Sequence, residues 1–351
     1  MILRRVLASV IVLAFFMPPQ QASAQAEVRT FHNPLLPSGP DPWVITDSGF
    51  YYYMATTATN LTIRRTRDLT DLANAETKVV WTPPPTGPYS KQIWAPELHR
   101  LDGKWYIYFA ADAGSNESHR IYVLENASAN PLEGDWTFKG KVADATDKWA
   151  IDATVFEDRG KKYMLWSGWE GDTDGEQRIF IARLKNPWTV DSSRTMLSRP
   201  QYPWEQVGDL PDRAAMPHVN VNEGPEILQH NGRTFLVYSA SACWSDFYEL
   251  GMLEAKPGSN LLKAKSWTKL DHPVFRQDPA AGVYATGHNG FFRSLDGEQD
   301  WIIYHANSGP HQGCSPRRSP RIQQFTWNPD GTPNFGSPVS SATEPDGPAS
   351  P

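Results

Sequence analysis

Five times along the chain, a polar or acidic position opens a strand-like segment that leads through a tight glycine turn into a run of apolar and aromatic residues. This pattern on both sides of a short turn is typical of an antiparallel β-hairpin. The expected hairpins cover residues 41–54, 94–109, 151–166, 223–238 and 288–304. The segments between them hold prolines and short strand patterns such as 121–124 and 178–182, and no strong amphipathic helix period.

The turn glycines occupy positions 49, 103, 160, 232 and 297, so they lie 54, 57, 72 and 65 residues apart. Each interval is long enough for one four-stranded sheet with its loops. Five similar β units imply radial repetition, which protects sheet edges from open pairing. We therefore predict an all-β fold, a five-bladed β-propeller over residues 25–339, with an all-β array or sandwich as the alternative. The tail at 340–351 is rich in Ser and Pro and is expected to be disordered.

Acidic residues fall at one point of this repeat. Eight residues before the turn glycines lie Asp41, Ala95, Asp152, Gly224 and Asn289. At this position or one residue earlier, four of the five copies carry a carboxylate or an imidazole, namely Asp41, Asp152, Glu223 and His288. Because equivalent strand ends surround one axis in a propeller, these side chains are expected to converge.

Grouped carboxylates have a use in the hydrolysis of glycosidic bonds. One carboxylic acid protonates the leaving oxygen, and a second carboxylate activates water or attacks. Crowded like charges raise at least one pKa, which supplies a protonated acid near neutral pH. Taken singly, Asp41 could be a turn residue, Asp152 a strand cap and Glu223 a solvated loop acid, but their shared position favours a catalytic role. His288 could be a hydrogen-bonded core residue or a ligand of an axial metal ion or water.

The N-terminus has the layout of a secretory signal peptide. Arg4 and Arg5 precede an apolar run at 6–17, and small residues at 22–24 predict cleavage after Ala24. The run is too short for a comfortable membrane span, so an uncleaved anchor is the weaker alternative. We expect a signal peptide over 1–24 and a secreted chain, extracellular or periplasmic, that is free of the membrane after cleavage.

Composition excludes several other classes of protein. The net charge of −6 argues against nucleic-acid binding, and the pair Arg317-Arg318 is too short a basic run to change this. No Gly-x-Ser-x-Gly elbow, phosphate-binding loop or dinucleotide fingerprint is present, so no organic cofactor is expected.

Cys243 and Cys314 could form a disulfide in an exported protein, but their spacing does not decide between a disulfide and two buried thiols.

Five short motifs occur in order, one in each expected blade: GPDP at 39–42, WAPE at 94–97, IDA at 151–153, EGP at 223–225 and GHN at 287–289. With these motifs, nearly the whole chain after the N-terminal segment resembles glycoside hydrolase family 43. The resemblance implies a five-bladed propeller and inversion at the anomeric carbon. It assigns Asp41 as the general base and Glu223 as the general acid, with Asp152 tuning the pKa of that acid and orienting it. It also places His288 where many members bind a central calcium or other ion, mainly through water.

Two further segments, 239–251 and 320–335, resemble the branch of the family that contains exo-acting α-L-arabinofuranosidases. That branch implies release of L-arabinose from the ends of plant cell-wall arabinan, arabinoxylan or their oligosaccharides. Arg321 would then contact hydroxyls of the terminal sugar, because a planar guanidinium suits that role. A salt bridge between blades is the structural alternative for Arg321.

Aromatic residues near the expected axis are candidates for stacking on sugars. Trp94 could stack on the sugar or pack within its blade, and Trp166, Trp169 and Trp244 are candidates for more distant subsites. The second blade carries Ala95 in place of an acid. Glu97 lies two residues further along, where it would point elsewhere or support the site.

Two other functions stay open on the same scaffold. A β-xylosidase or an endo-arabinanase would use the same acids, with a blocked pocket favouring exo cleavage and an open groove favouring endo cleavage. A non-catalytic carbohydrate-binding propeller would need neither a base at Asp41 nor an acid at Glu223.

Overall fold

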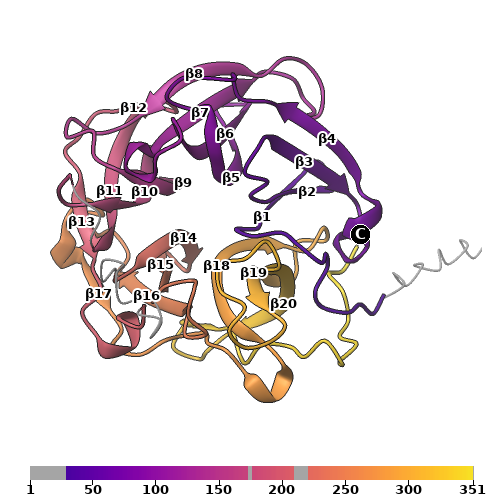
Figure 1. The fold of residues 1–351 in the computed structure, drawn as a ribbon. Helices are drawn as coiled ribbons and strands as arrows, with labels where there is room; N and C mark the ends of the chain where they lie inside the picture. The colour runs from indigo at the N-terminus through magenta and orange to yellow at the C-terminus, as the bar shows by residue number, and fades with distance from the viewer. Residues whose placement is uncertain (1–28, 173–175, 209–219, 351) are drawn as a thin grey trace, which may run out of the picture.

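A computed structural model describes residues 29–172, 176–208 and 220–350, which form five β-sheets arranged in a ring (Figure 1). Each sheet is built from consecutive, antiparallel strands, so each is one blade of a propeller. The prediction of a five-bladed β-propeller is confirmed. The expected signal peptide, residues 1–24, lies outside the described residues, and no helix among the described residues has the length and apolar character needed to cross a membrane.

The strands of the first three blades follow the expected hairpins. Blade I contains β1 (Trp43–Asp47), β2 (Phe50–Met54), β3 (Leu61–Thr66) and β4 (Glu76–Trp81). Blade II contains β5 (Lys91–Leu101), β6 (Lys104–Asp112), β7 (Arg120–Asn126) and β8 (Thr137–Val142). Blade III contains β9 (Ala150–Asp158), β10 (Lys161–Trp169), β11 (Gln177–Asn186) and β12 (Thr189–Val190), and β13 (Thr195–Ser198) also pairs with β11.

The last two blades repeat this arrangement. Blade IV contains β14 (Asn222–His230), β15 (Arg233–Ala240), β16 (Glu249–Ala255) and β17 (Trp267–Lys269). Blade V contains β18 (Tyr284–Arg293), β19 (Asp300–Asn307), β20 (Ser319–Trp327) and β21 (Pro333–Asn334). The helices in the described part of the chain are short 3₁₀ segments: η1 (Leu69–Asn74), η2 (Asn116–Ser118), η3 (Pro203–Glu205), η4 (Ala264–Ser266) and η5 (Pro279–Ala281).

The glycine turns predicted from the sequence join the first two strands of every blade. The five turn glycines have φ values of 75°, 78°, 71°, 75° and 76° in chain order, a conformation that costs an L-residue strain. In the first four turns the preceding residue also has a positive φ, which is the backbone of a type I′ hairpin. This turn twists in the same sense as the strands, so it fixes the register of the hairpin.

Hydrophobic cores lie between neighbouring blades, and together they hold the ring. One core joins blades I and II, and others join II to III, III to IV and IV to V. The ring closes at the core between blades V and I, where Val44 and Tyr51 pack with Trp301 and Ile322. Phe31, which precedes the first strand, packs into the same core and so ties the start of the chain to the last blade.

The C-terminal tail lies along the start of the chain, which corrects the expectation of disorder for residues 340–350. The backbone N–H of Gly347 donates to the carbonyl of Arg29 at 2.7 Å, and that of Phe31 donates to Pro345 at 3.1 Å. The backbone of Ala349 donates to Oε1 of Gln299 at 3.0 Å. A composition poor in apolar residues predicted disorder, but the tail obtains its order from backbone hydrogen bonds to a surface that only the closed ring provides.

We predict that Gly103→Ala lowers the free energy of unfolding by about 1–2 kcal/mol, because its φ of 78° costs an L-residue strain while a Cβ there would meet no atom. Urea denaturation measures this. Gly171→Ala is the matched control, since a Cβ there is equally unhindered and its backbone does not have a positive φ. Equal stability of the two variants would contradict the assignment of the turn.

Candidate active site

The first strand of every blade is irregular near its start, at the same place. The backbone is left-handed there at Asp41, Ala95, Asp152, Gly224 and His288, with φ values of 55°, 42°, 55°, 52° and 48°. In blades II to V the strand ladder shifts register beside this residue. Such a bulge re-aims a side chain at the edge of a sheet. The fold therefore uses one local distortion, repeated around the axis, to place the residues that the sequence singled out.

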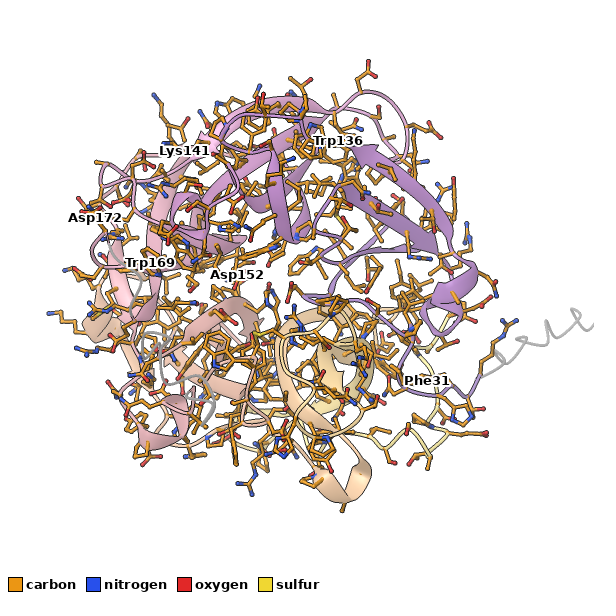
Figure 2. The ribbon with its side chains drawn as sticks, viewed as in Figure 1. Phe31, Trp136, Lys141, Asp152, Trp169 and Asp172 are labelled. Carbon is orange, nitrogen blue, oxygen red and sulfur yellow. A yellow bond between two sulfur atoms is a disulfide. The ribbon has the colours of Figure 1, made fainter. Side chains whose placement is uncertain are left out.

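The predicted acids meet in one cavity of about 860 Å³. Asp41 from blade I, Asp152 from blade III, Glu223 from blade IV and His288 from blade V all line it. Figure 2 shows Asp152 close to the middle of the ring, with Lys141 at its outer edge. The convergence predicted from the repeat is thus present in the structure.

Asp41 lies in a dense set of hydrogen bonds and ion pairs. Its Oδ1 is 3.0 Å from Nη1 of Arg318 and 3.3 Å from Nδ1 of His288. Thr56 donates its hydroxyl to Oδ2 at 2.6 Å, and the backbone N–H of Asp41 donates to Nδ1 of His305 at 3.0 Å. These contacts hold the carboxylate in one orientation.

The same contacts keep Asp41 charged. Burial favours the neutral form, but the Arg318 guanidinium, the two imidazoles and the Thr56 hydroxyl outweigh burial and hold the pKa of Asp41 well below its ordinary value. Asp41 is therefore a carboxylate at neutral pH. This is the protonation state that a general base requires.

Glu223 has the opposite electrostatics. Burial favours its neutral form, a hydrogen bond donated by Tyr248 to Oε1 at 2.9 Å opposes burial, and the charge of Asp41 favours the neutral form again. Together with a smaller opposing effect of Arg318, these interactions raise the pKa of Glu223 to about 7. Glu223 can therefore hold a proton near neutral pH, as a general acid must.

Asp152 is bound to the backbone beside the acid. Its Oδ2 accepts a hydrogen bond from the N–H of Gly224, the residue that follows Glu223, at 3.0 Å. Burial and the charges of Glu223 and Asp41 raise the pKa of Asp152 well above its ordinary value. Asp152 therefore contacts the strand that carries Glu223, and the charge of Glu223 affects the pKa of Asp152.

His288 lines the cavity, but the described residues do not by themselves form a calcium site. No group of three or more His, Cys, Asp or Glu side chains in the described part of the chain is arranged to hold one metal ion. Calcium takes roughly six to eight oxygen ligands, and His288 supplies one nitrogen. The axial ion implied by the family resemblance stays a prediction, in which water would provide most ligands.

The guanidinium in the cavity belongs to Arg318, which corrects the prediction for Arg321. Arg321 lies within β20, is fully buried, and donates from Nη2 to Oγ of Ser308 at 2.8 Å, away from the cavity-lining residues. Arg318 precedes that strand on the loop from β19, and it lines the cavity. Arg318 and Arg321 are only three positions apart, but residues inside the strand are packed between blades, whereas the loop before the strand reaches the axis. For this reason Arg318, and not Arg321, lies in the cavity.

The tryptophans divide into cavity and core residues. Trp94 and Trp244 line the cavity, and so does Trp149, which the sequence did not single out; the stacking of Trp94 on a sugar stays a prediction. Trp169 is buried and stacks on Trp149, with ring centroids 4.7 Å apart and an interplanar angle of 10°. Trp166 is also buried, so it and Trp169 are not subsites of this cavity.

Glu97 lies outside the residues that line the cavity. It is buried, and its Oε2 is 2.8 Å from Nε2 of His99. Burial and the neighbouring Glu97 raise the pKa of Glu226 well above its ordinary value. Glu97 therefore points away from the cavity lining, although its charge also raises the pKa of Asp152.

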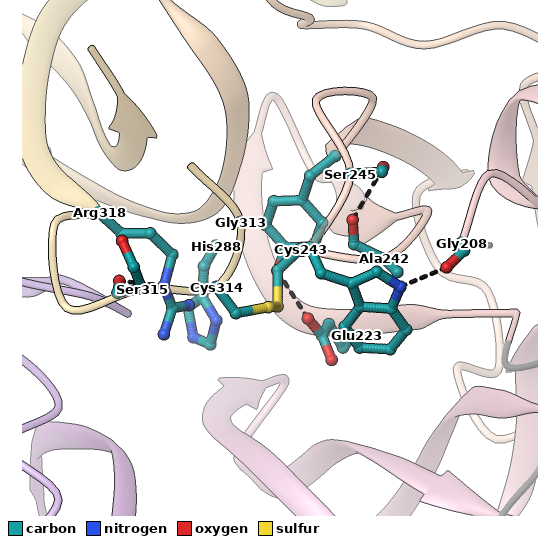
Figure 3. The surroundings of a disulfide bond; sticks show 12 residues. Gly208, Glu223, Ala242, Cys243, Ser245, His288, Gly313, Cys314, Ser315 and Arg318 are labelled. Atoms are coloured by element: carbon teal, nitrogen blue, oxygen red, sulfur yellow. Dashed lines mark hydrogen bonds between the residues drawn. A yellow bond between two sulfur atoms is a disulfide. The ribbon is translucent and has the colours of Figure 1, made fainter. Parts of the chain in front are cut away.

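Cys243 and Cys314 form a disulfide in the wall of the cavity, with Cα atoms 5.2 Å apart. Figure 3 shows it beside Glu223, His288 and Arg318. The bond joins the loop between β15 and β16 of blade IV to the loop between β19 and β20 of blade V. The two cysteines therefore form a disulfide and are not two buried thiols, the choice that their spacing left open. The bond connects two loops that carry residues of the site.

Thr56, Tyr248, His305 and Arg318 contact the acids but were not identified from the sequence. None of them belongs to the first strand of a blade, so the repeat gave no signal for them. Arg318 follows Arg317 in a short basic pair, which by itself indicates no role at a site. Tyr248 stood inside the segment 239–251 that carries the family resemblance, and this was the one signal that could have indicated it.

The sequence matches the family described as glycosyl hydrolases family 43 over residues 31–333. The chain therefore belongs to this family, and it is a glycoside hydrolase. A solved structure with 22% sequence identity, a thermostable family-43 glycoside hydrolase, has the same fold with a TM-score of 0.76 over 92% of this chain and 100% of that chain.

Particular relatives are more similar. The chain is 39% identical over 348 residues to an extracellular exo-α-(1→5)-L-arabinofuranosidase of Streptomyces avermitilis, covering 97% of this chain and 70% of that protein. It is 39% identical over 292 residues to a protein of the same description from Streptomyces chartreusis, covering 82% and 86% of the two chains. The crystal structure of an α-L-arabinofuranosidase from Lactobacillus brevis has a TM-score of 0.81 at 38% identity, covering 89% of this chain and 98% of that chain.

We predict that Arg318→Met lowers kcat/KM by roughly 10²–10³-fold, because it removes a charged donor from the cavity and from Asp41. The acidic limb of the pH–rate profile should also move to higher pH, since loss of the guanidinium raises the pKa of Asp41. Arg321→Met is the matched control, with kcat/KM within a few-fold of the parent because its side chain does not reach the cavity. A large loss for Arg321→Met with little for Arg318→Met would reverse our assignment.

Proposed function

We propose that this chain is an inverting exo-α-1,5-L-arabinofuranosidase that releases L-arabinose from the ends of arabinan or arabino-oligosaccharides. The observation that carries the proposal is electrostatic. Asp41 and Glu223 line one cavity, yet their surroundings drive their pKa values in opposite directions. One carboxylate and one carboxylic acid on either side of a bond are the requirement for glycoside hydrolysis.

In the proposed reaction, Asp41 removes a proton from a water molecule as that water attacks the anomeric carbon. Glu223 donates its proton to the glycosidic oxygen as the bond to the leaving sugar breaks. The bond to water forms on the face opposite the broken bond, so the configuration inverts. Exchange with solvent then returns the proton from Asp41 and restores the proton of Glu223. Asp152 orients Glu223 through the backbone of Gly224 and tunes its pKa.

The substrate assignment is supported by the relatives. Two of them are described as exo-α-(1→5)-L-arabinofuranosidases, and each is 39% identical to this chain. Both are described as extracellular, which supports export of this chain together with the signal-peptide layout of residues 1–24. Trp94, which is only partly buried and lines the cavity wall, offers an aromatic face on which a sugar ring can stack.

Product analysis tests the substrate and the stereochemistry together. The enzyme is incubated with linear arabinan, branched arabinan, arabinoxylan and xylo-oligosaccharides, and early products are followed by NMR. We expect monomeric L-arabinose from linear arabinan, appearing first as the β anomer. Release of xylose would identify a β-xylosidase, and release of arabino-oligosaccharides an endo-arabinanase. Absence of any product would support a binding protein, and a first-formed α anomer would exclude inversion.

We predict that kcat/KM falls as the pH rises above about 7, because Glu223 then loses the proton that it donates. Activity should persist toward low pH, below the ordinary range of an aspartate, since Asp41 stays ionised there. Initial rates across a pH series on an unactivated arabinoside measure both limbs. A profile that keeps rising well above neutral pH would contradict the assignment of Glu223.

We predict that Glu223→Ala loses most activity on natural arabinosides but recovers part of it on aryl arabinosides with acidic leaving groups, which need no protonation. General acid catalysis is worth about 10²–10⁴-fold, which sets the size of the difference. Asp41→Ala is the comparison, because loss of the base should abolish turnover of both substrates. Equal loss by Glu223→Ala on the two substrates would exclude its role as the acid.

A further inference from the structure

Tyr248 contacts the proposed acid directly, from a part of the chain outside the repeat. It ends the loop that precedes β16, and its hydroxyl donates to Oε1 of Glu223 at 2.9 Å. The side chain of Tyr248 is fully buried. A buried hydroxyl aimed at a carboxyl group restricts how that group can rotate.

The surroundings of Tyr248 hold its ring in one place. The ring stacks on the imidazole of His305, with centroids 5.6 Å apart and an interplanar angle of 8°. Gly287 leaves room for the ring, since a Cβ at this glycine would lie 2.1 Å from Cε1 of the tyrosine. Cys243, five positions before Tyr248, ties the same loop to blade V through the disulfide. The hydroxyl is therefore presented to Glu223 by a rigid support.

We propose that Tyr248 is a positioning residue for the general acid, which holds the Glu223 carboxyl by Oε1 and leaves Oε2 to protonate the glycosidic oxygen. This inference rests on the function proposed above for Glu223. A carboxylic acid protonates effectively only when its free oxygen is held toward the leaving group, so fixing one oxygen fixes the other.

The same hydrogen bond has a second consequence, for the pH at which the acid works. Glu223 is also faced by Asp41 from blade I, Asp152 from blade III and Arg318 from blade V. Burial and Asp41 raise the pKa of Glu223, whereas the Tyr248 hydroxyl and Arg318 lower it, because both favour the carboxylate. Removal of the hydroxyl alone must therefore move the titration of Glu223 to higher pH.

The test is the pH–rate profile of Tyr248→Phe, which keeps the ring and removes only the oxygen. We expect the alkaline limb to move upward by about one pH unit, a tenfold change in acid strength. We also expect a larger fall in kcat for substrates with poor leaving groups than for those with acidic leaving groups. An alkaline limb at the parent position would overturn the proposal, whatever the change in rate.

Tyr238→Phe is the matched control. Tyr238 is also fully buried and donates its hydroxyl to a carboxylate, Oε1 of Glu205 at 2.8 Å, but Glu205, unlike Glu223, does not line the cavity. This variant should lose stability and keep the parent's alkaline limb. An equal shift in both variants would show that the effect is general to buried tyrosines and would also overturn the proposal.

Gly287→Ala provides a second route, should Tyr248→Phe not fold. An added methyl must displace the tyrosine ring, so the limb should move in the same direction. Titration of Glu223 by ¹³C NMR of side-chain-labelled protein gives a readout that needs no substrate. If the parent enzyme hydrolyses no glycoside, the proposed function fails. If the parent hydrolyses glycosides but the pKa of Glu223 is the same in parent and variant, only the role of Tyr248 fails.

Discussion

Burial of three carboxyl groups that line one cavity, together with the repulsion between them, governs the protonation states of this site. Carboxyl groups close together in a low-dielectric cavity cannot all be ionised, so the surroundings of each group determine which one keeps its charge. Asp41 is surrounded by the Arg318 guanidinium, two imidazoles and the Thr56 hydroxyl, which favour its carboxylate form. Asp152 and Glu223 have fewer such partners, and burial then favours their neutral forms. The different protonation states of Asp41, the proposed base, and Glu223, the proposed acid, follow from this unequal distribution of partners.

The supporting residues come from the loops, whereas the acids come from the repeat. Each blade has one left-handed residue at or just before the start of its inner strand, and in blades II to V this residue lies at a bulge, which gives the ring its common set of positions at the axis. Loops between the second and third strands of blades IV and V then bring Tyr248 to Glu223 and Arg318 to Asp41. The disulfide between Cys243 and Cys314 joins these two loops, so the partner of the acid and the partner of the base share one covalent brace. Loops that carry function are commonly held in this way by a rigid scaffold.

Closure of the ring matters for the same reason. Only when blade V packs on blade I does His305, on β19, reach the backbone of Asp41, 264 residues away. The N-terminal segment around Phe31 and the C-terminal tail both pack near this seam, and they add backbone hydrogen bonds where no turn connects the blades. The geometry of the base therefore depends on contacts made at the two ends of the chain.

The sequence by itself determined the five hairpins, their glycine turns and the placement of Asp41, Asp152, Glu223 and His288 at one point of the repeat. These features depend on local chemistry, namely the two-residue period of a strand and the positive φ of a tight turn. They can therefore be predicted from the sequence of neighbouring residues. The structure differs from the expectations for Arg321, Trp166, Trp169 and the tail, and no local pattern indicates Thr56, Tyr248, His305 or Arg318 as residues that contact the acids. Whether such a residue faces the axis, a core or a neighbouring loop depends on contacts with residues far away in the chain. Those contacts, together with the pairing of Cys243 with Cys314 and the unequal charges of the acids, exist only once the ring has closed.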